Sequence, residues 1–391
     1  MRALIIVLGL GVVLAGGVGM AIGQVKRSEG DELKDAIYIK VEGKQVGTLP
    51  AQRVHLPDAD FTRGDARLGV TLAGHIYVAL WKNLHWSTDE GRTWSTRDLP
   101  VQSGGFGVLG DDTLVVFTGH PKPSTIRSTD YGKTWSKPTP VDISPYDTGG
   151  GGWGHVMQLT GGPALMTVQC CYEQDAKDPK SGKPRRKEQL GIYDHVYRST
   201  DSGKTWGDRS LICRDSAETS LLLLKSGKMM AATRRQRHPQ QTLPTDNVDE
   251  LKAQGMWDDQ HNQAYIRHAY FANSDDLGRT WKNLRLAPCY RLESGMAEQL
   301  CPSELLQLPD GRVVWIHHRR HRPLKGIYAR VSHDEGQTWT KRRYWLRDLR
   351  EQDHGLYPAS TVLKDGTLLT VTSTNHSNRS MAIRWRLPAG E

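Results

Sequence analysis

One octapeptide occurs five times in this chain of 391 residues, and each copy fits the pattern Ser-x-Asp-x-Gly-x-Thr-Trp without a mismatch. The copies begin at Ser87, Ser128, Ser199, Ser274 and Ser332 and end at Trp94, Trp135, Trp206, Trp281 and Trp339. Repeats separated by tens of residues indicate a fold that uses one supersecondary unit many times. This repeat therefore restricts the architecture more than any other feature of the sequence.

The chemistry of the octapeptide suits a tight turn between two strands. Its Asp carboxylate can accept hydrogen bonds from backbone N–H groups across the turn, and its Gly can adopt a positive φ angle. The final Trp is large enough to cover apolar surface between neighbouring sheets. In these respects the octapeptide resembles the Asp-box, or BNR repeat, of the sialidase (neuraminidase) superfamily. The resemblance implies that each box joins the third and fourth strands of a propeller blade.

A second, weaker repeat predicts the number of blades. Six short turns that contain Gly, Asp-Gly or Ser-Gly join one apolar run to the next, which is typical of β-hairpins. They lie at residues 72–75, 109–112, 159–162, 224–227, 308–311 and 363–366. Five precede an octapeptide, and the sixth leads to the last apolar segment, residues 382–387. We therefore predict an all-β fold, a six-bladed β-propeller of four-stranded antiparallel blades, closed by an N-terminal strand at residues 49–56.

The start of the chain predicts export. Arg2 precedes an apolar run that ends in small residues at Ala21-Ile22-Gly23, which is typical of a secretory signal peptide. The run is also long enough for an uncleaved membrane anchor. We expect a signal peptide or anchor at residues 1–23, a lead-in at 24–48 and one propeller domain at 49–387. The propeller would then be periplasmic, secreted or attached to the cell surface.

Composition narrows the set of partners. The 52 Lys and Arg residues exceed the 43 Asp and Glu residues by 9, and no basic segment interleaved with aromatic residues accompanies this excess. We therefore expect no nucleic-acid partner and favour an acidic glycan or glycoconjugate, bound by a monomer. The five cysteines show no zinc-binding spacing, so we expect neither metal nor cofactor. Cys289 and Cys301 are either a disulfide pair, which export permits, or buried small residues.

Many of the Arg and His residues are expected on one face of the propeller. The loops between second and third strands, and the connections between blades, lie on the face opposite the Asp-boxes. Convergent Arg, His and Tyr side chains near the propeller axis predict an anion-binding pocket with catalytic potential. The candidate substrate-binding residues are Arg63, Arg67, Arg234, Arg319, Arg320, Arg379, His120, His155 and His376.

The resemblance to sialidases implies roles for individual residues. In that superfamily three arginines bind the substrate carboxylate, a Tyr activated by a Glu is the nucleophile, and an Asp is the acid/base. A neutral Tyr suits this chemistry because an anionic anomeric centre repels a carboxylate nucleophile. Tyr357 lies before the sixth blade, where sialidases keep their Tyr. The three arginines correspond to Arg379, to Arg320 or Arg319, and to Arg63 or Arg67.

Two positions depart from the sialidase pattern. The family's acid/base Asp comes from the loop before the first Asp-box, but residues 81–85 contain no carboxylate. Asp65 is the nearest substitute. The Glu that activates the Tyr is expected before the fifth blade, where Glu298 and Glu304 are both candidates.

Three functions are compatible with this pattern. The first is a sialidase-like glycosidase of the exo-α-sialidase type that acts on acidic sugars. The second is a uronate-type polysaccharide lyase, in which His120, His155 and Tyr172 remove a proton while Arg neutralises the carboxylate. The third is a non-catalytic glycan-binding propeller. A carboxylate at hydrogen-bond distance from Tyr357 favours the first function, and a His pair flanking an Arg favours the second.

Overall fold

The protein is described by a computed structural model. The described residues are 36–57, 66–119, 122–144, 146–147, 154–173, 192–236, 249, 252, 257–258, 263–264, 267–288, 300–319, 325–348, 357–373 and 380–390. The chain divides into two compact units, Met1–Glu32 and Leu33–Glu391, and every described residue belongs to the second. The expected signal peptide, residues 1–23, therefore lies outside the described residues. Within those residues, no helix has the length and apolarity needed to cross a membrane.

The fold is all-β, as predicted, with strands that follow one another along the chain in antiparallel runs. Two of the sheets have four strands each. One contains β3 (Arg67–Val70), β4 (Ile76–Leu80), β5 (Asn83–Ser87) and β6 (Ser95–Asp98). The other contains β16 (Ser216–Leu223), β17 (Met229–Gln236), β20 (Arg267–Ser274) and β21 (Lys282–Leu286). A small separate sheet pairs β18 (Trp257–Asp258) with β19 (Gln263–Ala264).

A nine-stranded sheet joins two antiparallel runs. The first run is β7 (Gly105–Val108), β8 (Leu114–Thr118), β9 (Ser124–Ser128) and β10 (Thr139–Pro140). The second is β12 (Gly154–Gln158), β13 (Ala164–Glu173), β14 (Ile192–Ser199) and β15 (Gly207–Arg214), with β11 (Tyr146–Asp147) paired to β13. The runs meet where β7 and β12 pair in parallel. Glycine permits this approach, because a Cβ on Gly105 would lie 2.7 Å from the Gly154 carbonyl oxygen.

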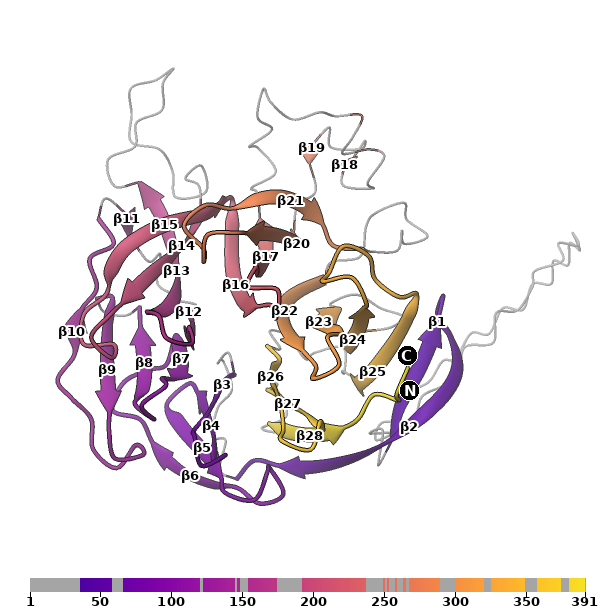
Figure 1. Cartoon of the computed structure of the whole chain (residues 1–391), viewed down its shortest axis with the longest axis horizontal. Coiled ribbons are helices and arrows are strands. Elements are labelled where there is room, and N and C mark those ends of the chain that lie inside the picture. Colours follow the sequence, from indigo (N-terminus) through magenta and orange to yellow (C-terminus); the bar gives the residue numbers. More distant parts are fainter. Residues whose placement is uncertain are drawn as a thin grey trace, which may run out of the picture. The chain divides into compact units, whose positions relative to one another are not determined.

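The other nine-stranded sheet contains both ends of the described chain. Its strand order is β22 (Leu300–Gln307), β23 (Val313–Arg319), β24 (Gly326–Ser332), β25 (Arg342–Asp348), β1 (Ala36–Val41), β2 (Lys44–His55), β28 (Met381–Trp385), β27 (Leu368–Thr372) and β26 (Ala359–Val362). Figure 1 shows the indigo strands β1 and β2 between orange β25 and yellow β28.

The N-terminal strands of this sheet were predicted in part. Residues Ala51 to His55 of β2 pair with β28, as expected for the strand at residues 49–56. The pairing of β1 with β25 was not anticipated, and it places residues 36–41 of the expected lead-in within a sheet. The β1–β2 hairpin therefore connects strands β22–β25 to strands β26–β28 in one sheet, whereas the octapeptide pattern predicts two separate antiparallel runs.

The turns have the geometry that the sequence repeats predict. In the first octapeptide, the Thr93 backbone N–H donates to Asp89 Oδ1 at 2.9 Å and Ser87 Oγ donates to the same oxygen at 2.8 Å. Gly91 has φ = 82°. The same Asp contacts recur in the other four copies, and every copy joins the third and fourth strands of its run. The six predicted hairpins are also present, each closed by a backbone bond between residues i+3 and i.

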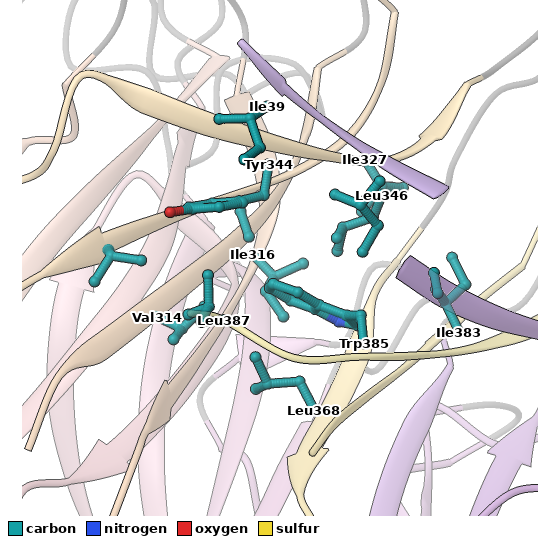
Figure 2. Close-up of a cluster of buried hydrophobic side chains, with 14 of the residues drawn as sticks. Ile39, Val314, Ile316, Ile327, Tyr344, Leu346, Leu368, Ile383, Trp385 and Leu387 are labelled. Carbon is teal, nitrogen blue, oxygen red and sulfur yellow. The ribbon is translucent and has the colours of Figure 1, made fainter. Parts of the chain in front are cut away.

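Apolar side chains pack both within the curled sheets and between neighbouring sheets. Figure 2 shows the largest cluster, in which Tyr344 of β25 and Ile316 of β23 lie with Leu368 of β27 and Trp385 of β28. The two ends of the same nine-stranded sheet thus share one core, which requires the sheet to curl. Cys170 and Cys213 are buried. Cys289 and the side chain of Cys301 lie outside the described residues, so their pairing stays a prediction.

The first strand of each antiparallel run contacts the first strand of the next. β3 contacts β7, β7 contacts β12, β12 contacts β16, β16 contacts β22, β22 contacts β26, and β26 contacts β3. This circuit of inner strands brings distant parts of the sequence together. The residues discussed below lie on these strands or directly beside them.

Candidate active site

Tyr357 and Glu218 form a buried pair. Tyr357 Oη donates a hydrogen bond to Glu218 Oε1 at 2.7 Å. Tyr357 lies two residues before β26, and Glu218 is the third residue of β16, so both belong to the circuit of inner strands. Their exposed fractions are 7% and 2%. The structure thus places a carboxylate oxygen where it can accept the phenol proton of Tyr357.

Arg234 contacts the same carboxylate oxygen. Its Nη1 lies 2.6 Å from Glu218 Oε1, and 11% of its side chain is exposed. Arg234 is on β17, opposite Ala217 of β16. A charge-assisted bond of this kind is stronger than a neutral one. Glu218 is therefore held by Arg234 while it receives the hydrogen bond from Tyr357.

The backbone of Glu218 is unusual. Its φ angle is 59°, which non-glycine residues rarely adopt and which costs about 1–3 kcal/mol. The β16–β17 register shifts between Ala217 and Ser220, so Glu218 and Thr219 form a β-bulge. Bulges commonly redirect a side chain at functional sites. Here the bulge directs the Glu218 carboxylate to Tyr357.

A second polar cluster adjoins the bulge. Ser220 Oγ donates to Glu304 Oε1 at 2.8 Å, and Arg67 Nη1 lies 3.9 Å from Glu304 Oε2. Burial raises the pKa of Glu304 to about 7, although the Arg67 charge and the Ser220 hydrogen bond oppose the shift. Glu304 therefore titrates near neutral pH.

His155 adjoins the same strand. Its Nδ1 accepts a hydrogen bond from the Leu221 backbone N–H at 3.0 Å. Burial, together with the charge of Arg67, lowers the His155 pKa to about 3. The ring is neutral at physiological pH, and because Nδ1 is an acceptor, its proton is on Nε2.

The structure describes six of the predicted site residues. Tyr357 and Arg234 meet at Glu218, while Glu304, Arg67 and His155 lie around Ser220 and Leu221 of the same strand. Arg319 is buried at the end of β23. The other seven predicted residues lie outside the described residues: Arg63, Asp65, His120, Glu298, Arg320, His376 and Arg379.

The carboxylate beside Tyr357 was not the predicted one. The sequence favoured Glu298 or Glu304, whereas the hydrogen bond is made by Glu218. A signal for Glu218 was present. If the two strands beside the turn at residues 224–227 pair in regular register, Glu218 lies opposite Arg234. The sequence therefore places an acidic and a basic residue across from each other in one hairpin. The bulge shifts that register by one residue and allows the carboxylate to contact both Arg234 and Tyr357.

Among the described residues, no group of three or more His, Cys, Asp or Glu side chains could hold a metal ion. The acidic and cationic side chains of the candidate site instead contact one another. The chemistry available there is proton transfer at Tyr357, Glu218 and Glu304, together with anion binding by Arg.

Comparisons with known proteins agree with the repeat and the fold. Residues 126–137 match the family model described as BNR/Asp-box repeat. A solved protein of unknown function from Dyadobacter fermentans is 19% identical, with a TM-score of 0.57 over 89% of this chain and 98% of that one. The Hadza microbial sialidase Hz136 is 16% identical, with a TM-score of 0.55 over 88% of this chain and 70% of that one. The protein thus carries Asp-box repeats in a fold shared with sialidase-like propellers.

One curated relative shares a short region of sequence. The xyloglucanase Xgh74A of Acetivibrio thermocellus is 30% identical over an alignment 138 residues long, and this alignment covers 31% of this chain. The match spans only 15% of the xyloglucanase. Its activity therefore does not carry over to this chain through that match.

Proposed function

We propose that this protein is an exported, sialidase-like glycoside hydrolase with Tyr357 as its nucleophile and Glu218 as the base that activates it. The observation that carries the proposal is the hydrogen bond from Tyr357 Oη to Glu218 Oε1, 2.7 Å long and buried. The resemblance to sialidases implies Tyr357 as the nucleophile independently of this hydrogen bond. A carboxylate beside it is the feature that favours hydrolysis over the other two functions.

We also propose that the domain has six blades. The closed circuit of contacts through β3, β7, β12, β16, β22 and β26 supports this count, because each of these strands begins an antiparallel run. The nine-stranded sheets would then be pairs of blades. One pair is joined by the β7–β12 contact and the other by the β1–β2 hairpin.

The proposed reaction has two steps. As Tyr357 Oη bonds to the anomeric carbon, its proton passes to Glu218, and the bond between the anomeric carbon and the leaving-group oxygen breaks. A protonated carboxyl gives the leaving group its proton, and Asp65 is the proposed donor. Water then attacks the anomeric carbon and gives a proton to that donor. Tyr357 leaves and takes its own proton back from Glu218.

Arginine and net charge support an acidic substrate. Arg234 contacts the same carboxylate oxygen as the Tyr357 hydroxyl, and its positive charge would favour the phenolate that forms in the first step. The proposed carboxylate-binding residues are Arg63 or Arg67, Arg319 or Arg320, Arg379 and Arg234. A net charge of +9 favours the approach of an anionic glycan to a monomeric, exported protein.

The state of His155 weakens the lyase alternative. A lyase base must accept a proton near neutral pH. His155 has a pKa lowered to about 3 by burial and by the Arg67 charge, and its Nδ1 already accepts a hydrogen bond from Leu221. It is therefore not suited to act as that base.

A screen of the purified full-length protein tests the proposal. The substrates are glycans that end in sialic acid, in another keto-acid sugar or in a uronate. Released reducing ends report hydrolysis, and ultraviolet absorbance of an unsaturated product reports a lyase. The proposal predicts reducing ends from an acidic keto sugar without unsaturated product. An unsaturated uronate product would establish the lyase, and binding without turnover of any substrate would establish a non-catalytic glycan-binding protein.

A further inference from the structure

A buried carboxyl links the strands that carry Glu218 and Arg234. Asp194 of β14 is 1% exposed. Its Oδ2 accepts hydrogen bonds from the Thr219 hydroxyl and, at 3.4 Å, from the Thr233 hydroxyl. Thr219 directly follows Glu218, and Thr233 directly precedes Arg234. Asp194 Oδ2 thus contacts the residues adjacent in sequence to Glu218 and to Arg234, the two members of the ion pair.

The bulge around Glu218 is held from the same side by other polar groups. Thr167 Oγ1 donates to the Thr219 carbonyl at 3.1 Å. Thr233 Oγ1 also lies 3.4 Å from the Ala217 carbonyl oxygen, so it shares its proton between that oxygen and Asp194. The strained φ of Glu218 is the kind of conformation that persists only when its surroundings fix it. Asp194 and Thr167, both from the β12–β15 run, supply that restraint.

We propose that Asp194 is a positioning residue, which holds the bulge so that the Glu218 carboxylate faces Tyr357. The expected effect on catalysis rests on the proposed function. The positioning of Glu218 by Asp194 does not, and it can be tested without a substrate. Asp194 Oδ1 has no hydrogen-bond partner among the described residues. The carboxyl is therefore engaged through Oδ2 alone, the oxygen that contacts both threonines.

The charge on Asp194 adds a pH dependence. Burial and the Glu218 charge raise the Asp194 pKa to about 7, against the opposing effects of Thr219, Arg234 and Thr233. Cys213 of β15 lies opposite Asp194 in the sheet. Burial raises the pKa of its thiol to about 11, so the thiol is neutral near pH 7. Asp194 is thus a neutral acid below pH 7. Its ionisation would place a second negative charge beside Glu218, so we expect kcat to fall as Asp194 loses its proton.

Four variants test the positioning role. Asp194→Ala removes the acceptor, and Thr219→Val removes the donor while keeping the side-chain shape. Asp194→Asn keeps an oxygen acceptor but cannot ionise. Thr125→Val is the matched control, since Thr125 is buried elsewhere, on β9, and its hydroxyl has no hydrogen-bond partner in the described part of the chain. If Asp194→Ala does not fold, Thr219→Val carries the test.

Two readouts separate this inference from the proposed function. Crystal structures of the variants give the distance from Tyr357 Oη to Glu218 Oε1 without any substrate. We expect it to exceed hydrogen-bond range, about 3.5 Å, in Asp194→Ala and Thr219→Val, and to stay short in Asp194→Asn and the control. An unchanged distance in both disruptive variants would overturn the inference, whether or not the protein is a hydrolase.

Kinetics give the second readout. On a substrate that the wild type hydrolyses, we expect kcat to fall by about tenfold or more in Asp194→Ala and Thr219→Val, with KM little changed. The Asp194→Asn variant should have a kcat close to that of the wild type, and its kcat should not decline above pH 7. An alkaline decline that persists in Asp194→Asn would overturn the role assigned to the Asp194 charge.

Discussion

Glu218 Oε1 lies 2.7 Å from Tyr357 Oη and 2.6 Å from Arg234 Nη1, so one carboxylate oxygen joins a phenol to a guanidinium. Glu218 and Arg234 lie on the paired strands of one hairpin, whereas Tyr357 comes from a distant part of the chain. Each of the three lies on or beside a strand of one inner circuit. The second carboxylate oxygen, Oε2, is buried and has no hydrogen-bond partner among the described residues.

Replacing Glu218 by Gln tests the base. The amide keeps the size of the side chain but cannot take the Tyr357 proton, so kcat should fall by about 10²–10⁴-fold, the usual contribution of general acid–base catalysis. Steady-state kinetics on the best substrate from the screen measures the change. The control is Gln307→Glu on β22, which exchanges the same two residue types in the reverse direction. It reports how a change of one charge affects kcat in general. Retention of wild-type kcat in Glu218→Gln would remove Glu218 from the mechanism.

Two arginines outside the described residues remain predictions from the sequence. If Arg320 and Arg379 bind the substrate carboxylate, each change to Ala should weaken binding of an acidic sugar by about 1.5–3 kcal/mol, the worth of a hydrogen bond to a charged group. The free energy of unfolding should change little. Calorimetric titration with the acidic sugar and its neutral counterpart makes the comparison. Equal affinity of wild type and both variants for the acidic sugar would exclude this role.

Gly107 is expected to be essential for contact between inner strands. A Cβ at this position would collide with the carbonyl and side chain of Val156 on β12. Gly107→Ala should therefore lower the free energy of unfolding by about 1–3 kcal/mol, as overpacking does. Gly207→Ala is the matched control, because a Cβ there meets nothing within 4 Å. Urea denaturation measures both variants, and equal stability would show that the two strands can move apart at little cost.

Acid should destabilise the fold through His85. Its side chain is fully buried, and both ring nitrogens lack a hydrogen-bond partner among the described residues. Burial lowers its pKa from 6.5 to about 4, so the unfolded chain binds the proton more readily than the folded one. Stability is therefore lost as pH falls from 6.5 to 4, by up to roughly 3 kcal/mol from this group.

His85→Leu isolates that contribution. The variant cannot take up a proton, so its free energy of unfolding should decline less than that of the wild type between pH 7 and pH 4.5. Chemical denaturation at both pH values gives the two differences. Identical losses in wild type and variant would show that His85 reaches solvent in the folded state.

Sequence predicted the local structure well and the long-range contacts less well. The octapeptide turns follow from neighbouring groups, such as Asp89 with Thr93, so they can be inferred without knowledge of the fold. The pairing of β1 with β25 could not be inferred from the sequence, because residues 36–41 carry no turn or repeat that specifies a partner strand. Tyr357 became a candidate through the resemblance to sialidases, which keep a Tyr before the corresponding strand. Glu218 was missed because its orientation depends on a bulge and a positive φ angle, and neither leaves a clear mark in the sequence.

The substitution Tyr357→Phe tests whether Tyr357 is the nucleophile. The change keeps the buried ring and removes only the oxygen that bonds to Glu218. The measurement is mass spectrometry of wild type and variant after incubation with a fluorinated acidic sugar that traps a glycosyl–enzyme intermediate. We expect a covalent adduct on Tyr357 of the wild type, no adduct on the folded variant, and a loss of hydrolysis by orders of magnitude. A variant that hydrolyses substrate at the wild-type rate, or a wild-type adduct on another residue, would show that Tyr357 is not the nucleophile.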